Sequence, residues 1–292
     1  PTQTMALLPG SPAIDAGGNG LAIDANGQAL LTDQRGQPRI ANGTVDIGAY
    51  ETAGPLVVNT IQDGTALGPG LISLREAIAL TEPPFDSQPI TFAAGLHGTI
   101  ALTGGPLTLT VTSAPLTISG PGSAVLRVSG SSPVFSVGAS TTVTIKGIEI
   151  TGGGPGIANA GFLTLDADLI DGNGLSSGLT NTGTAALTDC TVSNNTGDGI
   201  DSTGKLAVTD STVSGNGSRG IVNSGIATLS GSTISGNQTT ADGGGVLNNA
   251  NATLTLTNCT ISGNQAHGDN GGGGIDNLGQ LTLVNCTVSD NT

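Results

Sequence analysis

The sequence predicts an all-β fold, a right-handed parallel β-helix with a short N-terminal capping helix, preceded by an irregular end segment. Three observations lead to this fold class. A unit of 21 to 27 residues recurs from residue 156 onward, and its copies align like residues in columns. Each copy holds three short stretches of alternating apolar and polar residues, separated by Gly and Asn. A helix-start sequence stands ahead of the repeats, where a solenoid needs a cap.

The recurring unit reads G-I-x-N, then a short L-x-L stretch, then (C/S)-T-(V/I)-S-x-N. Helical solenoids usually have longer repeats, and a leucine-rich horseshoe needs one long L-x-x-L-x-L consensus, so three short strands per turn favour a parallel β-helix. Successive units are separated by 22, 21, 21, 27 and 27 residues, measured on the last Asn of each. The last two units therefore carry six extra residues.

Three columns of the alignment are apolar in every unit and predict the inward faces of three strands. Their members are Ile157, Leu179, Ile200, Ile221, Val246 and Ile275; Leu165, Leu187, Val208, Leu229, Leu256 and Leu283; and Ile170, Val192, Val213, Ile234, Ile261 and Val288. Strands are also expected in residues 97–151, in PLTLTV, PLTISG, VLRVSG, PVFSV and TVTIKGIEI, as less regular coils.

Two further columns are polar, and we interpret both as structural ladders of stacked side chains, because buried amides need hydrogen-bond partners. One column is Asn159, Asn181, Ser202, Asn223, Asn248 and Asn277, and the other is Asn173, Asn195, Asn216, Asn237, Asn264 and Asn291.

The three cysteines share one column, which contains Asp168, Cys190, Ser211, Ser232, Cys259 and Cys286. The parity of this column with the apolar columns points it inward, so stacked buried thiols are the simplest interpretation. Cys259 and Cys286 lie on adjacent coils, which is close enough for a disulfide as the alternative.

The helix-start sequence is Ser73-Leu74-Arg75-Glu76, a capping box in which Ser73 and Glu76 would cap a short amphipathic helix over the first coil. Pro83-Pro84 would end this helix. At the other end, Thr292 follows directly on a complete repeat signature. We therefore expect that either further coils or another molecule cover the edge of the last coil.

Composition narrows the choice of partners. The chain has 292 residues, 49 Gly, 2% aromatic residues and a net charge of −14, from 7 Lys and Arg against 21 Asp and Glu. Without a basic stretch, nucleic acid is a poor partner. Three cysteines cannot form a disulfide scaffold, and no apolar run is long enough for a membrane span in this segment.

The motifs LVVNTIQDG, SLREAIAL, ITFAAGLHGTIAL, PLTISGPG and LTLTNCTISGN make residues 55–292 resemble bacterial exported β-helix proteins of the CSLREA type. Ile72 stands where that motif has Cys. Residues 1–54, with PTQTMALLPGSPAIDAGGN, DQRGQPRI and GTVDIGAYE, resemble the end segment of choice-of-anchor Q β-helix proteins. Similar repeats occur in polymorphic outer-membrane proteins and adhesins.

The resemblance divides the chain into residues 1–54, an end segment like the closing part of a preceding β-helix module; 55–96, the β-helix start with its helix; and 97–292, the coils. A closing segment that comes first suggests a join between consecutive modules. The resemblance thus implies a structural module of an extracellular fibre, sheath or surface adhesin at the cell surface. Its partners would be copies of itself, stacked end to end as a homopolymer or tandem modules, and surface glycans.

A carbohydrate-active enzyme, a polysaccharide lyase or hydrolase, is the main alternative, because parallel β-helices often carry such sites. Asp189 and Asp210 occupy equivalent positions on neighbouring units, but no Lys, Arg or His lies near them in the sequence. We interpret them as solvated turn residues, expect no catalytic residues, and predict that the chain is not an enzyme. A glycan-binding adhesin that does not assemble is the other alternative.

The end segment is rich in acidic and amide side chains, and such oxygen-rich loops bind calcium in other proteins. The candidate ligands are Asp15, Asp24, Asn26, Asp33 and Asp46. We favour a network of Asp–Arg pairs with Arg35 and Arg39 instead, and expect no other cofactor. Rows of outward Thr on the coils suit carbohydrate or ice, but the coils differ in length and the rows are interrupted, so this interpretation is weak.

Overall fold

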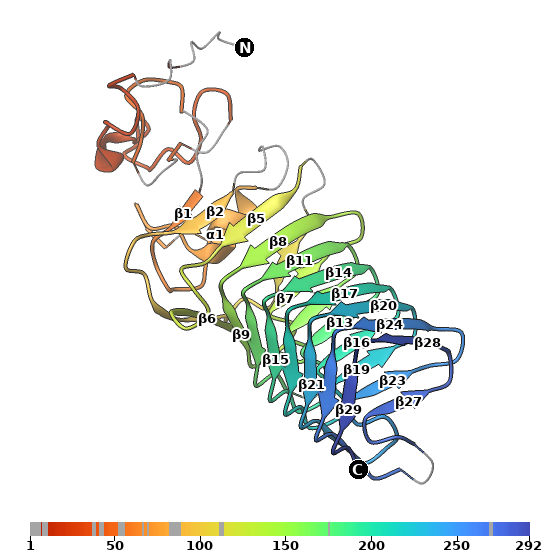
Figure 1. Ribbon diagram of the computed structural model, residues 1–292. Coiled ribbons are helices and arrows are strands. Elements are labelled where there is room, and N and C mark those ends of the chain that lie inside the picture. The colour runs from red at the N-terminus through yellow and green to blue at the C-terminus, as the bar shows by residue number, and fades with distance from the viewer. Residues whose placement is uncertain are drawn as a thin grey trace.

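The computed structural model describes residues 7, 11–36, 39–40, 44–51, 56–65, 67–68, 70–81, 89–110, 114–174, 176–268 and 271–292. The chain winds into a right-handed parallel β-helix, which confirms the predicted fold class. Figure 1 shows the coils stacked into a rod, with the end segment beyond its first coil. Each regular coil contributes one strand to each of three parallel sheets, which we call sheets I, II and III.

Sheet I consists of β1 (Leu56–Val58), β2 (Ile90–Phe92), β5 (Leu116–Ser119), β8 (Thr142–Lys146), β11 (Phe162–Asp166), β14 (Thr184–Thr188), β17 (Lys205–Thr209), β20 (Ile226–Ser230), β24 (Thr253–Thr257) and β28 (Gln280–Val284). Sheet II consists of β3 (Gly98–Ala101), β6 (Leu126–Ser129), β9 (Glu149–Thr151), β12 (Leu169–Asp171), β15 (Thr191–Ser193), β18 (Thr212–Ser214), β21 (Thr233–Ser235), β25 (Thr260–Ser262) and β29 (Thr287–Ser289). Sheet III consists of β4 (Leu107–Leu109), β7 (Phe135–Val137), β10 (Ile157–Asn159), β13 (Leu179–Asn181), β16 (Ile200–Ser202), β19 (Ile221–Asn223), β23 (Val246–Asn248) and β27 (Ile275–Asn277).

The six extra residues of the last two units do not disturb this register. Most of them lie at one corner, where β22 (Gln238–Thr239) and β26 (Gln265–Ala266) form a small separate sheet, and the rest lengthen the turn between β23 and β24. On both sides of the corner with the small sheet the main strands still pair in step, as in Ile234 with Ile261 and Val246 with Ile275. Coil length therefore varies outside the three sheets.

The core is a stack of aliphatic side chains along the axis of the rod. The three apolar columns point inward, and Leu165, Val192 and Ile234 have no exposed surface. Burying one such side chain contributes roughly 1.5–3 kcal/mol. Stacking aliphatic residues in register fills a narrow interior without aromatic bulk, which explains how a chain with 2% aromatic residues folds.

Both Asn columns form hydrogen-bonded ladders inside the rod. The Asn159 amide donates to Asn181 Oδ1 (2.7 Å), and the Asn248 amide donates to Asn277 Oδ1 (2.7 Å). In the second ladder each Asn Oδ1 from Asn195 onward accepts two bonds from the preceding coil; Asn216 Oδ1, for example, accepts from the backbone N–H (3.1 Å) and the amide (2.9 Å) of Asn195. The pattern continues without a break from Asn173 to Asn291.

The column of thiols and hydroxyls makes a third ladder. Cys190 N–H donates to Ser211 Oγ (3.0 Å), and Cys259 N–H donates to Cys286 Sγ (3.4 Å). Each of these thiols and hydroxyls also donates to the carbonyl two residues earlier. Cys and Ser both donate and accept here, so they can replace each other. The three thiols are unbonded to one another.

A short helix, α1 (Leu74–Ala79), covers the first coil and contacts β1 and β4. Ser73 Oγ accepts the N–H of Glu76 (2.9 Å), which satisfies one of the free donors at the start of the helix. Leu74, Ala77 and Ile78 face the core. Arg75 is fixed by Asp63, with Nε 2.7 Å from Oδ1. None of the helices in the described residues has the length and hydrophobicity needed to cross a membrane.

The end segment has little regular structure within its described residues. It contains a 3-10 turn, η1 (Asn19–Leu21), and an isolated antiparallel bridge between Ile23 and Ala29, and Thr32 and Thr44 also stand in isolated bridges. Val45 and Ala22 are buried, while Leu21 is 83% exposed. Its shape depends on polar contacts more than on a core.

Candidate functional site

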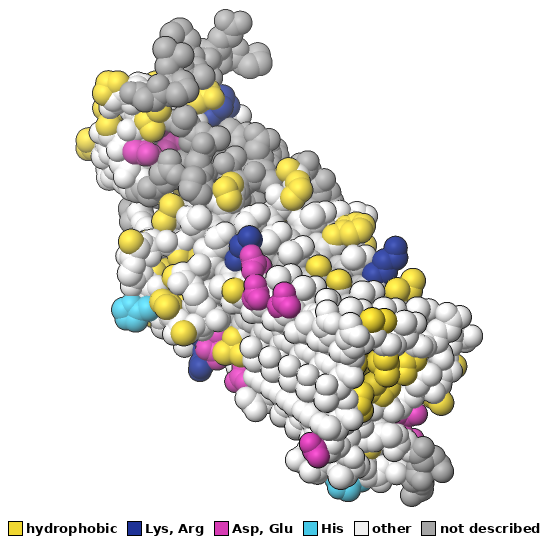
Figure 2. All heavy atoms as spheres, in the orientation of Figure 1, with side chains coloured by type: hydrophobic (Ala, Val, Ile, Leu, Met, Phe, Trp, Pro, Cys, Tyr) yellow, Lys and Arg dark blue, Asp and Glu magenta, His cyan; other side chains and the backbone are white. Residues whose placement is uncertain are grey.

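The last coil presents interior side chains to the outside at the end of the rod. Leu283 pairs in register with Leu256, and Val288 with Ile261. Leu256 and Ile261 have no exposed surface, whereas Leu283 is 45% and Val288 is 49% exposed. Figure 2 shows hydrophobic side chains gathered at this end of the rod, over β27, β28 and β29. The same positions that form the core elsewhere form an apolar surface here.

The hydrogen-bond ladders also reach this surface. Asn264 N–H and its amide both donate to Asn291 Oδ1 (3.0 and 2.9 Å), so each Asn donates to the Asn of the following coil. Within the described residues, Asn277 makes a bond to Gly279 O (3.2 Å), but it lacks the bond to a following coil that Asn248 makes. The surface therefore offers hydrogen-bond donors as well as apolar side chains to whatever covers it.

The end segment exposes apolar side chains at the opposite end of the molecule. Exposed fractions are 83% for Leu21, 56% for Ile47 and 47% for Ile23. We call these three residues the end-segment apolar surface. Large exposed apolar groups on a small irregular segment are typical of a protein contact.

Paired charges hold the end segment together. Asp33 accepts from Arg35 Nε (2.9 Å) and Nη2 (2.7 Å), and Arg35 lies over the ring of Tyr50 at 3.5 Å from the centroid. Arg39 Nη1 lies 2.9 Å from Glu51 Oε2, and Glu51 is 2% exposed. The predicted Asp–Arg network is thus present, and it includes Glu51.

The candidate calcium ligands are divided between different places. Asp15 and Asp46 come together with Glu51, with carboxylate oxygens within 4.8 Å of one another. Asp33 belongs to the Arg35 pair. Asp24 and Asn26 form a turn of their own, in which Asp24 Oδ1 accepts the N–H groups of Asn26 and Gln28, both at 2.8 Å. The turn bonds lower the pKa of Asp24, chiefly the bond from Gln28.

The sequence groups Glu51 with these residues in one polar segment but does not name it as a candidate ligand. Its Oε2 already accepts Arg39 and the N–H of Asp46 (2.9 Å). Arg39 therefore neutralises part of the charge of this carboxylate group, which favours the ion-pair interpretation over a cation site.

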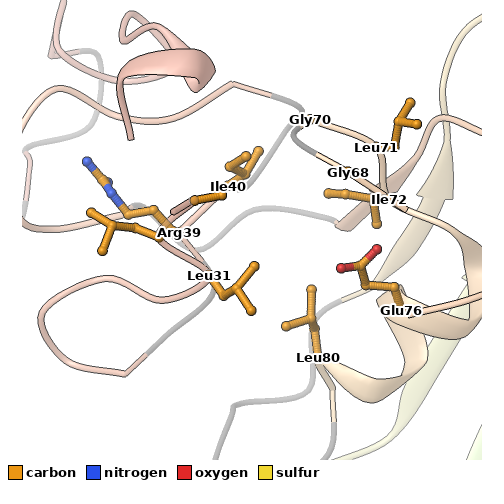
Figure 3. Close-up of a pocket in the computed structure, with 11 residues that line it drawn as sticks. Leu31, Arg39, Ile40, Gly68, Gly70, Leu71, Ile72, Glu76 and Leu80 are labelled. Atoms are coloured by element: carbon orange, nitrogen blue, oxygen red, sulfur yellow. The ribbon is translucent and has the colours of Figure 1, made fainter. Parts of the chain in front are cut away.

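A small cavity of about 90 Å³ lies between the end segment and the capping helix. Figure 3 shows Leu31 and Ile40 on one side, with Ile72 and Leu80 on the other, and the Glu76 carboxylate directed toward the gap. Glu76 Oε2 is buried without a hydrogen-bond partner among the described residues. Burial raises the pKa of Glu76, opposed by a bond from the Ser73 backbone. The end segment thus meets the cap through an apolar, incompletely filled junction.

Asp189 and Asp210, the positions of interest for a hydrolase or lyase, stand at the corner between sheets I and II. Their φ angles are 53° and 48°, and the same corner holds Asn258 (56°) and Asn285 (53°) on later coils. Asp, Asn and Gly are the residues that tolerate this left-handed conformation. Neither carboxylate belongs to an ion pair found among the described residues. The left-handed backbone conformation of this corner is enough to explain why Asp occupies both positions.

Asp168 is different, because its carboxylate lies inside the rod and is 2% exposed. Oδ1 accepts the N–H of Ile148 (2.8 Å) and Oδ2 accepts the N–H of Asp166 (3.2 Å). Burial raises the pKa of Asp168 to about 7, against the lowering effect of these two bonds. Burial likewise raises the pKa of the neighbouring Cys190 thiol to about 12, which makes it unreactive.

The structure also brings together several polar side chains at the corner between sheets II and III, where the sequence alone does not indicate a group. Asp198 Oδ1 accepts from Ser218 Oγ (2.6 Å) and the N–H of Arg219 (2.9 Å), and Arg219 Nε donates to Asp242 O (2.7 Å). Burial raises the pKa of the nearby Asp201 carboxyl, with Asp198 adding to the effect. Only the coil-to-coil register could have revealed this group, since its members come from different units.

No family model and no curated protein match the chain. Among solved structures, it is similar to the crystal structure of pectate lyase Pel9A, with 14% identity over 80% of this chain and 77% of that chain, and a TM-score of 0.38. It is also similar to ORF18 of Geobacillus virus E2, with 12% identity over 80% of this chain and 60% of that chain, and a TM-score of 0.36. Similarities this distant carry no argument about activity. The parallel β-helix is established by the pairing of the chain's own strands.

Proposed function

We propose that this chain is a structural module of an extracellular fibre, sheath or surface adhesin of the CSLREA and choice-of-anchor Q type, and that it assembles end to end. The contact joins the last coil of one module to the end-segment apolar surface of the next. The modules are parts of one polypeptide or separate molecules. The extracellular location follows from the resemblance to exported proteins.

The observation that carries this proposal is the in-register stacking of apolar positions through the described coils. Leu283 and Val288 occupy positions that are fully buried in the preceding coil, so a neighbour that continues the stack, whether a further coil or another module, gains the free energy of a core contact. The opposite end of the molecule exposes the apolar side chains of Leu21, Ile23 and Ile47. Two different surfaces at opposite ends give a head-to-tail contact, which produces an open filament.

The test is assembly of the 292-residue protein as a function of concentration, by sedimentation and negative-stain electron microscopy. We expect filaments whose axial repeat is at least about 43 Å, the length of nine strand spacings in sheet I. Compact, monodisperse particles at every concentration would contradict the proposal.

A polysaccharide-degrading enzyme is the competing function, and a direct assay separates the two. The protein is incubated with acidic and neutral polysaccharides, with and without Ca²⁺, and products are measured. Release of oligosaccharides that is lost in Asp189→Asn or Asp210→Asn would overturn the structural proposal. We expect no cleavage, because both residues are corner residues of left-handed backbone conformation.

A further inference from the structure

The column of thiols and hydroxyls contains two cysteines on adjacent coils. Cys259 stands directly before β25 and Cys286 directly before β29, and these strands pair in register, Thr260 with Thr287. The N–H of Cys259 donates to the sulfur of Cys286 (3.4 Å), so the contact between the two coils extends back to the cysteines. We call Cys259 and Cys286 the thiol pair.

The two side chains of the thiol pair have the same orientation. Each thiol donates to the carbonyl group two residues earlier, Cys259 to Thr257 (3.3 Å) and Cys286 to Val284 (3.4 Å). The thiols also interact with each other: burial is the main cause that raises the pKa of the Cys259 thiol, and the charge and hydrogen bond of Cys286 add to it. The two sulfur atoms therefore lie side by side along the axis of the rod.

This arrangement has the dimensions of a disulfide bond. Neighbouring strands of a sheet lie about 4.8 Å apart, and disulfide-bonded cysteines have Cα atoms about 4.4–6.8 Å apart. Both side chains leave the backbone on the same face, so rotation of the side chains is enough to join the sulfurs. The backbone of the two coils can keep its register.

The third cysteine provides a comparison within the same column. Cys190 has Asp168 on the preceding coil and Ser211 on the following coil, and neither residue carries a thiol. Its environment is otherwise that of Cys259, because both side chains are buried and both donate to the carbonyl group two residues earlier. Only the thiol pair has a partner for oxidation within the chain.

We propose that the thiol pair is an oxidation site, at which Cys259 and Cys286 form a disulfide bond that joins two adjacent coils covalently. The structure holds the reduced form of this site. Disulfide bonds persist in oxidising surroundings such as the outside of the cell, which is the location proposed above. The bond itself does not depend on assembly of the modules.

A small disulfide such as glutathione disulfide is the oxidant. The thiolate of Cys286, the more exposed cysteine of the pair, attacks glutathione disulfide, forms a mixed disulfide with one glutathione and releases the other. The thiolate of Cys259 then attacks the sulfur of Cys286 and releases the second glutathione. Both cysteine sulfurs are oxidised, the glutathione disulfide is reduced to two thiols, and the two protons of the cysteines end on these thiols.

The second of these steps sets the pH dependence of the reaction. Since the pKa of the Cys259 thiol is raised, little of it is thiolate at neutral pH, and the bond should form faster as pH rises. The position of Cys259 beside its target compensates for the small thiolate fraction, because the attack occurs within one molecule.

The bond would fasten a whole coil. Cys259 and Cys286 are 27 residues apart in the sequence, and the segment between them contains β25, β26, β27 and β28. Closing this loop restricts the unfolded chain, so oxidation should raise the melting temperature. It should also prevent the two coils from separating locally.

The test is oxidation of the purified 292-residue protein with glutathione disulfide at mildly alkaline pH. Free thiols are then counted in denaturant, and peptides are mapped by mass spectrometry without reduction. We expect the three thiols to fall to one, that of Cys190, with a linked peptide pair containing Cys259 and Cys286. The protein should lose the mass of two hydrogen atoms, and dithiothreitol should reverse both the mass change and the rise in melting temperature.

Cys259→Ser and Cys190→Ser are the matched variants, and both should fold because Ser occupies the same column at Ser211 and Ser232. Circular dichroism checks that they do. Oxidised Cys190→Ser should contain no free thiol and should melt at a higher temperature than its reduced form. Cys259→Ser should retain the thiol of Cys190 and show no rise in melting temperature.

Three outcomes would overturn the proposal. They are three free thiols after oxidation of the folded wild-type protein, a lasting glutathione adduct on Cys286, and a disulfide between two molecules in place of the internal one. Thiol counts in denaturant do not depend on filaments, so failure of this test is distinguishable from failure of end-to-end assembly.

Discussion

The buried carboxyl group of Asp168 connects the stability of the rod to pH. Burial raises its pKa to about 7, from an ordinary value of 3.8. Between these two values the folded protein retains a proton that the unfolded chain releases, so the free energy of unfolding falls as pH rises. The contribution is fully present below about pH 4 and is lost as pH rises through about 7, and it is worth roughly 4 kcal/mol at most.

Asp168→Ser tests this pH dependence, because Ser occupies the same column in two later coils, at Ser211 and Ser232. Urea unfolding between pH 4.5 and 8 should show a decrease in stability with rising pH for the wild type and a flatter profile for the variant. Identical profiles would contradict the assignment. Asp63 does not interfere, because burial raises its pKa less than the bonds from Arg75, Gly104 and Thr103 lower it, to about 2.

The Asn ladder predicts a large loss of stability from one small substitution. Asn216 Oδ1 accepts both donors of Asn195, and its amide donates to Asn237 Oδ1 (2.8 Å), all inside the rod. Asn216→Ala leaves buried donors without acceptors, at about 1–3 kcal/mol for each. We expect a loss of about 3–5 kcal/mol by chemical denaturation.

Asn249→Ala is the control, since Asn249 bonds Ser224 (2.8 Å) at an exposed position. It should change stability by less than about 0.5 kcal/mol. A loss of stability in Asn216→Ala as small as that in Asn249→Ala would mean that the ladder contributes little to the stability of the fold.

At the scale of the element, glycine sets the close approach of successive coils at the corner before sheet I. A Cβ atom on Gly204 would lie 1.9 Å from the carbonyl oxygen of Gly183 on the preceding coil. Gly183 and Gly225 are equally restricted, at 2.2 Å from Gly161 O and 2.1 Å from Gly204 O. The two-residue turns of these coils therefore exclude a side chain at this position, whereas the longer turn ahead of β24 holds Ala252 there.

Gly204→Ala should push the two coils apart locally and destabilise the protein by about 1–3 kcal/mol, the usual effect of overpacking. Gly20→Ala, in the end segment with nothing within 4 Å of the new methyl, is the control. A melting temperature of Gly204→Ala that equals that of the control would contradict this account of the corner.

The strands could be predicted from the sequence because the repeat places residues of the same kind at equivalent positions in successive coils. Columns of like residues predict that Ile170, Val192 and Val213 share one sheet, and the three residues do pair in register in sheet II. The end segment has no period, so the contact of Asp15 and Asp46 with Glu51 depends on a chain path that no pattern in the sequence specifies.

The unequal repeat lengths are hard to interpret from the sequence for a related reason. An alignment of the repeats does not show where the extra residues leave the rod. Most of them lie at the corner of β22 and β26 and the rest in the turn between β23 and β24, so the strands of the three sheets still pair in register. The positions of these insertions are what the sequence leaves unspecified.

At the scale of the whole molecule, charge and shape act in opposite directions on assembly. The net charge of −14 makes the sides of two rods repel one another. Most of the basic residues are already engaged in ion pairs, among them Arg35, Arg39 and Arg75. In the proposed assembly, apolar contact at the two ends would be the attraction, and it would favour a linear filament over a lateral bundle.

Mixing two variants tests the proposed head-to-tail contact most directly. Val288→Lys blocks the last coil and leaves the end segment intact, whereas Leu21→Lys blocks the end segment and leaves the last coil intact. Ile226→Lys, on a side chain that is 51% exposed in the middle of the rod, is the control and should assemble like the wild type.

By size-exclusion chromatography with light scattering, each end variant alone should be a monomer, because every contact needs one surface of each kind. An equimolar mixture should give dimers and nothing longer, since one contact uses the only two intact ends. A mixture that stays monomeric, or an end variant that still polymerises alone, would contradict head-to-tail stacking.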